Sequence, residues 1–283
     1  MPPLRILLLL FLSVTLTACR QAKHDNSKVL TVSIEPLRYV VKAIVDDKYE
    51  VNTLMPQGAS PETYEPVPRQ MMELDGSEMV IRMGTLGFEQ TKLPQIVASV
   101  PHLTMIDAAQ GIPMLTDSHH HAHDTESLDP HTWMSPQNLV VMARNVTRAL
   151  CEKDTMNASF FKQRLARFEK NMDVLDVQLR KALLHLPSRS FLIYHPALGY
   201  MARQYGLQQL AVEHDGKEPS AAYMQQLVNK CRNENVKVVF ISKEHSGRAA
   251  QRIANELGAK VVNINPLDYD VPAQMKMIAK SLK

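Results

Sequence analysis

Two histidines stand on stiff backbone, at positions where their imidazoles could bind a metal ion. His131 lies in residues 129–136 (DPHTWMSP), directly after a proline that restricts the backbone and two residues before the only tryptophan. His195 lies in residues 194–200 (YHPALGY), after an apolar run and before a helical pattern. Its side chain is therefore expected in the crevice beyond the ends of parallel strands. A buried structural histidine is the alternative in each case, and we favour metal ligands.

A third segment adds carboxylates to these imidazoles. Residues 56–66 (PQGASPETYEP) predict a turn made rigid by glycine and proline directly after a candidate strand, with Glu62 and Glu65 as candidate donors. A solvated acidic turn is the alternative. Imidazole with carboxylate suits zinc, and also manganese or iron where carboxylates are more numerous. No cysteine lies near the three segments, so a thiolate-rich structural zinc site is excluded.

A histidine-rich tract comes shortly before His131. Four imidazoles within five residues are typical of a weak metal-scavenging tract, and a solvated loop without function is the alternative. The four are His119, His120, His121 and His123.

Short β-rich runs alternate with helical patterns along most of the chain. This alternation predicts an α/β fold of two lobes, residues 29–156 and 188–283, each a mainly parallel sheet flanked by helices. Candidate strands are residues 29–34, 49–55, 79–83, 103–106, 191–194, 209–212, 236–241 and 260–264. Candidate helices are residues 36–45, 197–205, 220–233, 247–257 and 272–282.

One long helix is predicted to join the lobes, over residues 157–187. Apolar residues recur at steps of three or four from Phe161 to Leu183, and Pro187 bounds the pattern. At 1.5 Å per residue the helix would be roughly 45 Å long, enough to run the height of a two-lobed molecule. We expect it to pack against both lobes of a monomer. A coiled-coil dimerisation helix is the alternative.

The first residues indicate export and attachment to a membrane. Residues 1–18 combine a positive charge with an apolar core too short to span a bilayer comfortably, which is typical of a signal peptide. They end in Leu-Thr-Ala before Cys19, which resembles a bacterial lipobox and implies a lipid on Cys19, with residues 19–28 as a tether. An ordinary secretory signal is the alternative. Only Cys151 and Cys231 then remain, and the sequence leaves open whether they pair.

Composition and motifs exclude several classes of function. The formal net charge is a modest +3, and no run of lysine and arginine indicates a nucleic-acid partner. The sequence contains no H-E-x-x-H, no G-x-S-x-G and no P-loop.

Together the segments resemble the metal-binding component of bacterial ABC importers for zinc and manganese, in particular its zinc-type, ZnuA-like members. The Gly-Ala-Ser-Pro-x-x-Tyr-Glu-Pro loop, Asp-Pro-His-x-Trp-x-Ser-Pro and His-Pro-Ala-x-Gly-Tyr match the family's motifs in order and approximate spacing. Residues 213–220 (EHDGKEPS) resemble the family's Gly-x-Glu-Pro-Ser segment. The resemblance covers essentially the whole mature chain.

The resemblance implies one metal ion between the lobes, held by one ligand from each of three loops and a fourth near the C-terminus. By motif, Glu62, His131 and His195 take the first three positions, and Asp268 is our choice for the fourth. The alternatives for the fourth position are Asp270, Asn265, a water molecule and a histidine of residues 119–123.

The same comparison bears on which metal is bound. The third position is histidine in zinc-type members and usually a carboxylate in manganese-type members, so His195 indicates zinc. The first position is commonly histidine, whereas this chain has Glu62. A carboxylate also binds zinc, but the change weakens discrimination against Mn²⁺ and Fe²⁺.

We therefore expect a binding protein and not an enzyme. It would capture Zn²⁺ outside the cytoplasm, at a membrane surface, and deliver it to an ABC permease. A manganese or iron carrier of the same family is the first alternative. A zinc hydrolase with Glu62 as general base is a weaker one, and a surface-adhesin role would be compatible with metal binding.

Overall fold

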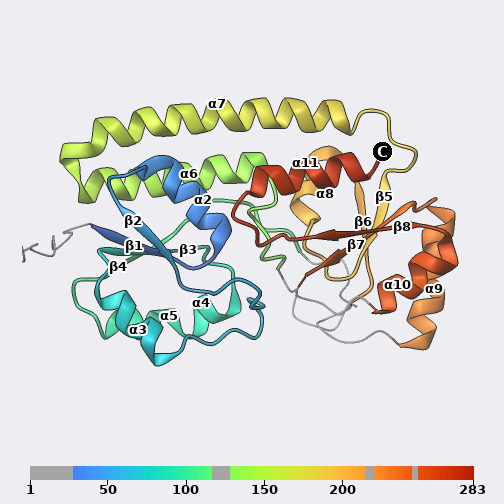
Figure 1. Ribbon diagram of the computed structural model, residues 1–283, viewed down its shortest axis with the longest axis horizontal. Coiled ribbons are helices and arrows are strands. Elements are labelled where there is room, and N and C mark those ends of the chain that lie inside the picture. Colours follow the sequence, from blue (N-terminus) through green and yellow to red (C-terminus); the bar gives the residue numbers. More distant parts are fainter. Residues whose placement is uncertain (1–27, 117–127, 214–219, 244–247) are drawn as a thin grey trace, which may run out of the picture.

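Two four-stranded parallel sheets form the two lobes of the protein (Figure 1). The computed structural model describes residues 28–116, 128–213, 220–243 and 248–283. The strand order is β2-β1-β3-β4 in the N-terminal sheet and β6-β5-β7-β8 in the C-terminal sheet. The strands are β1 (Val29–Val32), β2 (Glu50–Thr53), β3 (Met79–Arg82), β4 (Thr104–Asp107), β5 (Ser190–Ile193), β6 (Gln208–Ala211), β7 (Val238–Ser242) and β8 (Lys260–Ile264). Each overlaps a strand predicted from the sequence, so the two-lobed α/β fold is confirmed.

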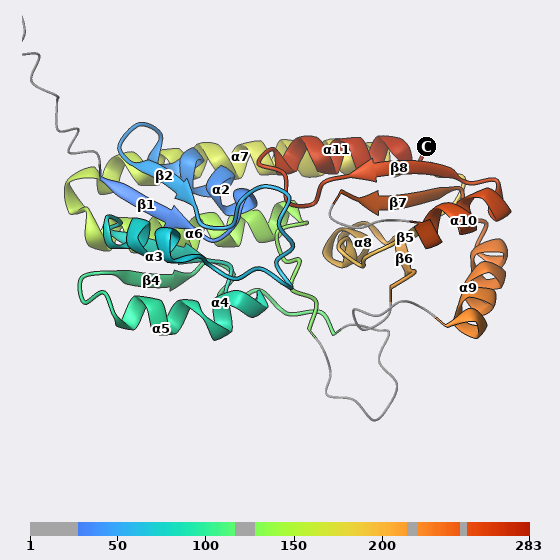
Figure 2. The same cartoon turned by 60° about the horizontal axis from the view of Figure 1, so that its bottom comes forward.

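Helices cover both faces of each sheet, as a parallel sheet requires (Figure 2). The central strands β5 and β7 are buried along their whole length. The helices of the N-terminal lobe are α2 (Glu35–Val45), α3 (Pro68–Asp75), α4 (Gly87–Thr91) and α5 (Leu93–Ala98). Those of the C-terminal lobe are α8 (Gly199–Tyr205), α9 (Ala221–Asn233), α10 (Arg248–Leu257) and α11 (Val271–Ser281).

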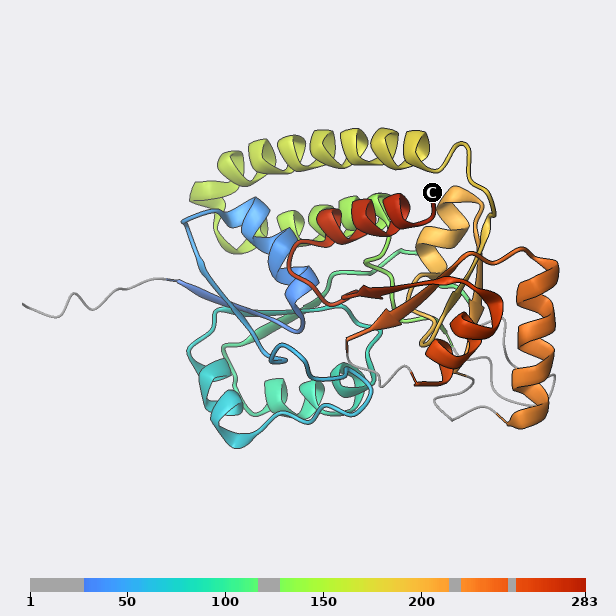
Figure 3. The ribbon, with the colours of Figure 1, turned by 45° about the vertical axis from the view of Figure 1, so that its right-hand side comes forward.

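The long helix α7 (Ala158–Ala182) runs along both lobes (Figure 3). It packs against α2 of the N-terminal lobe and α11 of the C-terminal lobe. Its buried face holds Phe161, Phe168, Met172, Leu175 and Leu179. The predicted linking helix is therefore confirmed. It ends at Ala182, about one turn earlier than the sequence pattern indicated and before Pro187, which disfavours helical backbone in the residue ahead of it.

A second long helix, which the sequence reading did not predict, lies alongside α7. This helix, α6 (Pro136–Lys153), begins with the hydroxyl of Ser135 accepting a hydrogen bond from the amide of Asn138 and with proline in its first turn. A single 3-10 turn, Thr155–Asn157, connects it to α7. The connection between the lobes is thus a helical hairpin and not one isolated helix.

Two further features bear on the sequence predictions. Within the described ranges, no helix is long and apolar enough to cross a membrane. Cys151 and Cys231 are both free thiols and do not pair with each other.

Candidate metal centre

The ligand-bearing segments meet where the carboxyl ends of the two sheets face each other. In each sheet the strand order reverses beside the first strand, β1 or β5, which is where parallel α/β proteins form a crevice. Glu62 lies in the loop after β2, and His195 lies two residues after the end of β5. His131 comes from the segment between β4 and α6. All three side chains line one pocket between the lobes.

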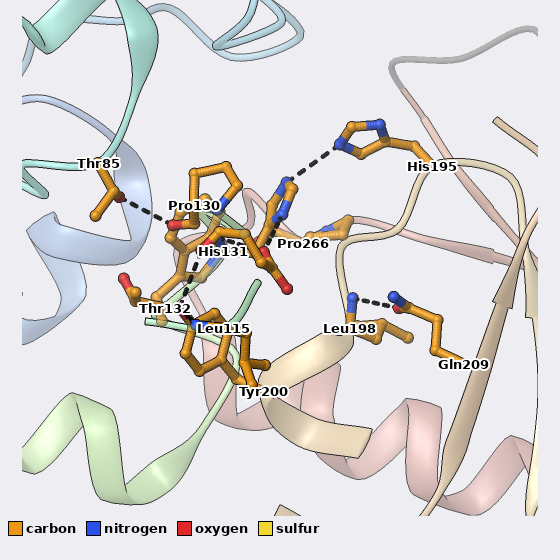
Figure 4. Close-up of polar contacts among 12 residues, drawn as sticks. Thr85, Leu115, Pro130, His131, Thr132, His195, Leu198, Tyr200, Gln209 and Pro266 are labelled. Atoms are coloured by element: carbon orange, nitrogen blue, oxygen red, sulfur yellow. Dashed lines mark hydrogen bonds and ion pairs between the residues drawn. The ribbon is translucent and has the colours of Figure 1, made fainter. Parts of the chain in front are cut away.

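Donor atoms of His131 and Glu62 each lie close to the same nitrogen of His195, and Glu62, His195 and Glu213 place ligand atoms within 4.8 Å of one another. Nε2 of His131 is 3.2 Å from Nε2 of His195, and Oε1 of Glu62 is also 3.2 Å from Nε2 of His195. Figure 4 shows the two imidazoles pointing toward each other. Two nitrogens bound to one tetrahedral zinc ion at 2.0–2.1 Å would be about 3.3 Å apart, so the observed spacing fits a shared ion.

A carboxylate holds the other ring nitrogen of each histidine. Oδ1 of Asp129 lies 2.8 Å from Nδ1 of His131, and Oε2 of Glu213 lies 2.7 Å from Nδ1 of His195. Because an ionised carboxylate only accepts hydrogen bonds, each Nδ1 is assigned the proton, which leaves the Nε2 lone pair free for a metal. Carboxylates in this position fix the orientation of a ligating imidazole and raise its basicity.

The surroundings of His195 shift its pKa in two opposing directions. Burial has the largest single effect and lowers the pKa, because it disfavours the charged imidazolium. The hydrogen bond to Glu213 raises it, as do the negative charges of Glu62 and Asp129. The net result is a pKa above the ordinary value of 6.5. The pocket is therefore an environment that favours positive charge, from either a proton or a cation.

The two histidine segments are locked to each other across the lobes. The hydroxyl of Tyr200 on α8 donates to the carbonyl of Asp129 at 2.9 Å and accepts from the amide of Leu115 at 3.1 Å (Figure 4). The indole of Trp133 donates to the carbonyl of Pro266 at 2.8 Å, and both residues are buried. Tyr200 thus connects the His131 segment to the helix that follows His195, and Trp133 connects it to the loop between β8 and α11.

The Glu62 loop is held at its base and open at its tip. The hydroxyl of Tyr64 lies 2.7 Å from Oε1 of Gln70 and 2.9 Å from the carbonyl of Leu54. The side-chain amide of Gln70 donates to the same carbonyl at 2.8 Å. Glu62 itself keeps 47 % of its side chain exposed, far more than His131 or His195. Of the three donors, Glu62 is the one that solvent reaches most easily.

Two other predicted donors lie elsewhere. Oε1 of Glu65 forms an ion pair with Lys92 at 3.2 Å. Asp268 uses its carboxylate within its own loop: one oxygen accepts from the amide of Asp270 at 2.9 Å and the other from the side chain of Asn265 at 3.3 Å. Asp268 is absent from the pocket lining, which does include its neighbours Pro266 and Leu267. Cys19 and the histidines at 119, 120, 121 and 123 lie outside the described residues.

The sequence reading did not give the two supporting carboxylates a role. Both lie close to a histidine in the sequence: Asp129 is two residues before one, and Glu213 is directly before one. The Asp-Pro-His order was a usable signal for Asp129, because an aspartate often accepts hydrogen bonds from the backbone two residues on. Oδ1 of Asp129 does accept from the amide of His131, at 2.9 Å. For Glu213 no local signal existed, since it meets His195 only through pairing of β5 with β6.

Comparison with known proteins shows the family to which the chain belongs. The family model for ZnuA, described as zinc-uptake complex component A, periplasmic, matches residues 30–282. The high-affinity zinc uptake system protein ZnuA of Bacillus subtilis is 27% identical over 259 residues, which is 87% of this chain and 80% of the relative.

Solved structures share the same fold. A crystal structure of ZnuA superposes with a TM-score of 0.84 at 34% identity, covering 90% of this chain and 97% of that one. The binding protein FpvC of Pseudomonas aeruginosa, solved in complex with Mn²⁺, has a TM-score of 0.77 at 24% identity and covers 90% of this chain and 96% of its own. The chain therefore belongs to the ZnuA family, the metal-binding components of zinc and related metal ABC importers.

Proposed function

We propose that this chain captures one Zn²⁺ ion between its lobes and delivers it to a metal-ion ABC permease in the membrane. The observation that carries the proposal is that donor atoms from two other loops, Nε2 of His131 and Oε1 of Glu62, each lie 3.2 Å from Nε2 of His195. Membership of a zinc-uptake family and the similarity to the zinc uptake protein of Bacillus subtilis support it.

Zinc is proposed over manganese because of the donor types. Two imidazoles and one carboxylate form a set that zinc binds well in three-ligand sites, whereas manganese favours sets dominated by oxygen. Glu62 makes this preference weaker than three histidines would. For the fourth position the sequence predicts Asp268, with a water molecule among the alternatives, and binding by Asp268 would require the loop hydrogen bonds to Asp270 and Asn265 to open.

The role is binding without chemical conversion of a substrate. Asp129 and Glu213 orient the imidazoles, and the cross-lobe contacts of Tyr200 and Trp133 hold the two histidine segments in place. Loading and release would then involve chiefly the exposed Glu62 loop and not a wide opening of the lobes, since α7 packs against both. The zinc-loaded protein is expected to show no hydrolase activity.

The site of action is proposed to be the outer side of a bacterial membrane, with the monomeric chain anchored by a lipid on Cys19. The lipobox-like ending of residues 1–18 supports this address. A Cys19→Ser variant expressed in a bacterium should move from the membrane fraction to the soluble extracytoplasmic fraction. Retention in the membrane fraction would contradict the anchor while leaving metal capture untouched.

Calorimetric titration with Zn²⁺ tests metal capture. The wild type should bind one equivalent, and His131→Ala and His195→Ala should each lose most of the affinity. His102→Ala is the matched control, because His102 is an exposed histidine whose ring contacts the carbonyl of Asp75, outside the metal pocket. If both pocket variants bind zinc as tightly as the control does, the site assignment is wrong.

A further inference from the structure

A buried hydroxyl that lines the metal pocket has no hydrogen-bond partner among the described residues. It belongs to Ser242, the last residue of β7, whose exposure is only 2 %. Leaving a buried hydroxyl unpaired costs about 1–3 kcal/mol, so such a group in a native structure calls for an explanation.

Its position separates Ser242 from the other unpaired hydroxyls. Within the described ranges, Thr132 and Thr147 also bury a hydroxyl without a partner, and neither of them lines this pocket. Of the described residues, only Ser242 both lines the candidate metal centre and has a buried hydroxyl without a hydrogen-bond partner. A ligand that enters the pocket would therefore meet a hydroxyl donor and acceptor that no described residue engages.

Strand pairing places Ser242 beside the segment that carries His195. Strands β5 and β7 are neighbours in the parallel sheet, and the amide of Tyr194 donates to the carbonyl of Phe240 at 3.0 Å just beyond the ladder. His195 and Ser242 thus leave the same sheet at its carboxyl edge, beside the point where the strand order reverses. Both residues line the same pocket, so an ion bound to His195 would share that pocket with the Ser242 hydroxyl.

Three protein donors leave one position open on a four-coordinate zinc ion, and a water molecule is the simplest ligand for that position. Glu62, His131 and His195 supply three donor atoms, and zinc with three protein ligands takes a water molecule in the fourth position. The carboxylate of Asp268 is engaged in its own loop. A water molecule bound to zinc is a strong hydrogen-bond donor, because the ion draws electron density from its oxygen.

We propose that Ser242 is a positioning residue for this metal-bound water: its hydroxyl accepts a hydrogen bond from the water that completes the coordination of the ion. The inference rests on the proposed function, since it presumes that an ion binds at His131 and His195. In this arrangement the hydroxyl of Ser242 gains a hydrogen-bond partner when the ion is bound. It also assigns the fourth position to water and not to a side chain.

Ser242→Ala tests the assignment through two readouts. The thermal midpoint of the metal-free protein should stay unchanged or rise, because no hydrogen bond is lost. Zn²⁺ affinity, measured by competition with a chelator, should fall about tenfold, or about 1.4 kcal/mol. Ser242→Thr, which keeps a hydroxyl, should restore most of the affinity. Thr147→Val is the matched control: it removes a buried unpaired hydroxyl outside the pocket and should leave affinity unchanged.

The Co²⁺-substituted protein tests for the water itself. Added azide should displace the water and change the visible absorption spectrum of the wild type, and Asp268→Asn should leave that spectrum as it is. If azide has no effect and Asp268→Asn alters the spectrum, the fourth ligand is Asp268 and the inference is overturned. Equal zinc affinity of Ser242→Ala and wild type overturns the role of Ser242 alone. Failure of the wild type to bind Zn²⁺ or Co²⁺ overturns the proposed function as well.

Discussion

The carboxylate of Asp129 lies against Gly199 so closely that a Cβ at Gly199 would overlap Oδ2 of Asp129. Oδ1 of the same carboxylate holds both the amide and Nδ1 of His131, at 2.9 and 2.8 Å. Gly199 begins α8, four residues after His195. Gly199, in the segment of His195, thus leaves room for the Asp129 carboxylate, which orients His131.

Gly199→Ala should weaken zinc binding about tenfold, which corresponds to about 1.4 kcal/mol. The added methyl group displaces the Asp129 carboxylate, and His131 then loses the acceptor that fixes its ring. Zinc titration of the variant measures the loss. Gly76→Ala is the control, because Gly76 has a negative φ and meets only an ordinary contact at 3.6 Å. Unchanged affinity of Gly199→Ala would show that Asp129 need not hold its position.

Zinc affinity should depend on pH through His195. Protons compete with the ion for its Nε2, and because its pKa lies above the ordinary 6.5, affinity should begin to fall at a higher pH than for an ordinary imidazole. Glu213→Gln removes the hydrogen-bonded charge that raises this pKa. The midpoint of the pH dependence should therefore move to lower pH, while affinity at high pH drops by about 10–100-fold.

Titration of zinc affinity against pH measures both effects of Glu213→Gln. Glu65→Gln serves as the control, since Glu65 pairs with Lys92 and the charge it removes lies outside the pocket. An unchanged midpoint in Glu213→Gln would contradict the role given to that carboxylate.

Glu62→His should raise the preference for Zn²⁺ over Mn²⁺. The change replaces an oxygen donor by an imidazole and gives three histidines, a set that favours zinc over an ion that prefers oxygen. Competitive titration of both variants with the two ions gives the ratio of dissociation constants. A ratio that stays the same or moves toward manganese would mean that Glu62 does not contact the ion.

Asp154 connects the end of α6 to the residues that precede β1 and β2. Its carboxylate accepts from Lys28 at 2.9 Å, Tyr49 at 3.1 Å and the side chain of Asn157 at 2.8 Å. Burial alone would raise its pKa, but these hydrogen bonds outweigh burial and lower the pKa to about 2. A lowered pKa means that this stabilisation is present above the unfolded pKa near 4 and is lost as pH falls toward 2.

Asp154→Asn should lower the free energy of unfolding at neutral pH by about 2 kcal/mol. Urea denaturation at about pH 7 and about pH 3 should show the gap between variant and wild type shrinking at the lower pH. Asp173→Asn, at an exposed position on α7, should change stability by less than about 0.5 kcal/mol at either pH. If the variant and the wild type differ equally in free energy of unfolding at both pH values, the stabilising effect of Asp154 does not depend on the charge of its carboxylate.

Most of the fold was predictable because short apolar runs separated by turn residues mark buried parallel strands. The short helices α3, α4 and α5 were not predicted, and neither was α6, although Ser135 and Pro136 form a recognisable helix start.

The site was predictable only as far as local motifs reach. His131 and His195 were singled out by their backbone context, and the structure brings their Nε2 atoms together. Glu213 and Ser242 could not be found in this way, because strand pairing in the C-terminal sheet decides that they lie near His195. Asp268 was chosen by its place in the chain, and the hydrogen bonds that occupy its carboxylate depend on the local turn.

A crystal structure of the zinc-loaded protein, with anomalous scattering recorded at the zinc edge, tests the central claim most directly. The account predicts one strong peak between the lobes, about 2.0–2.1 Å from Nε2 of both His131 and His195 and bonded to Glu62. A peak bound elsewhere, or no ordered zinc at this pocket, would contradict it.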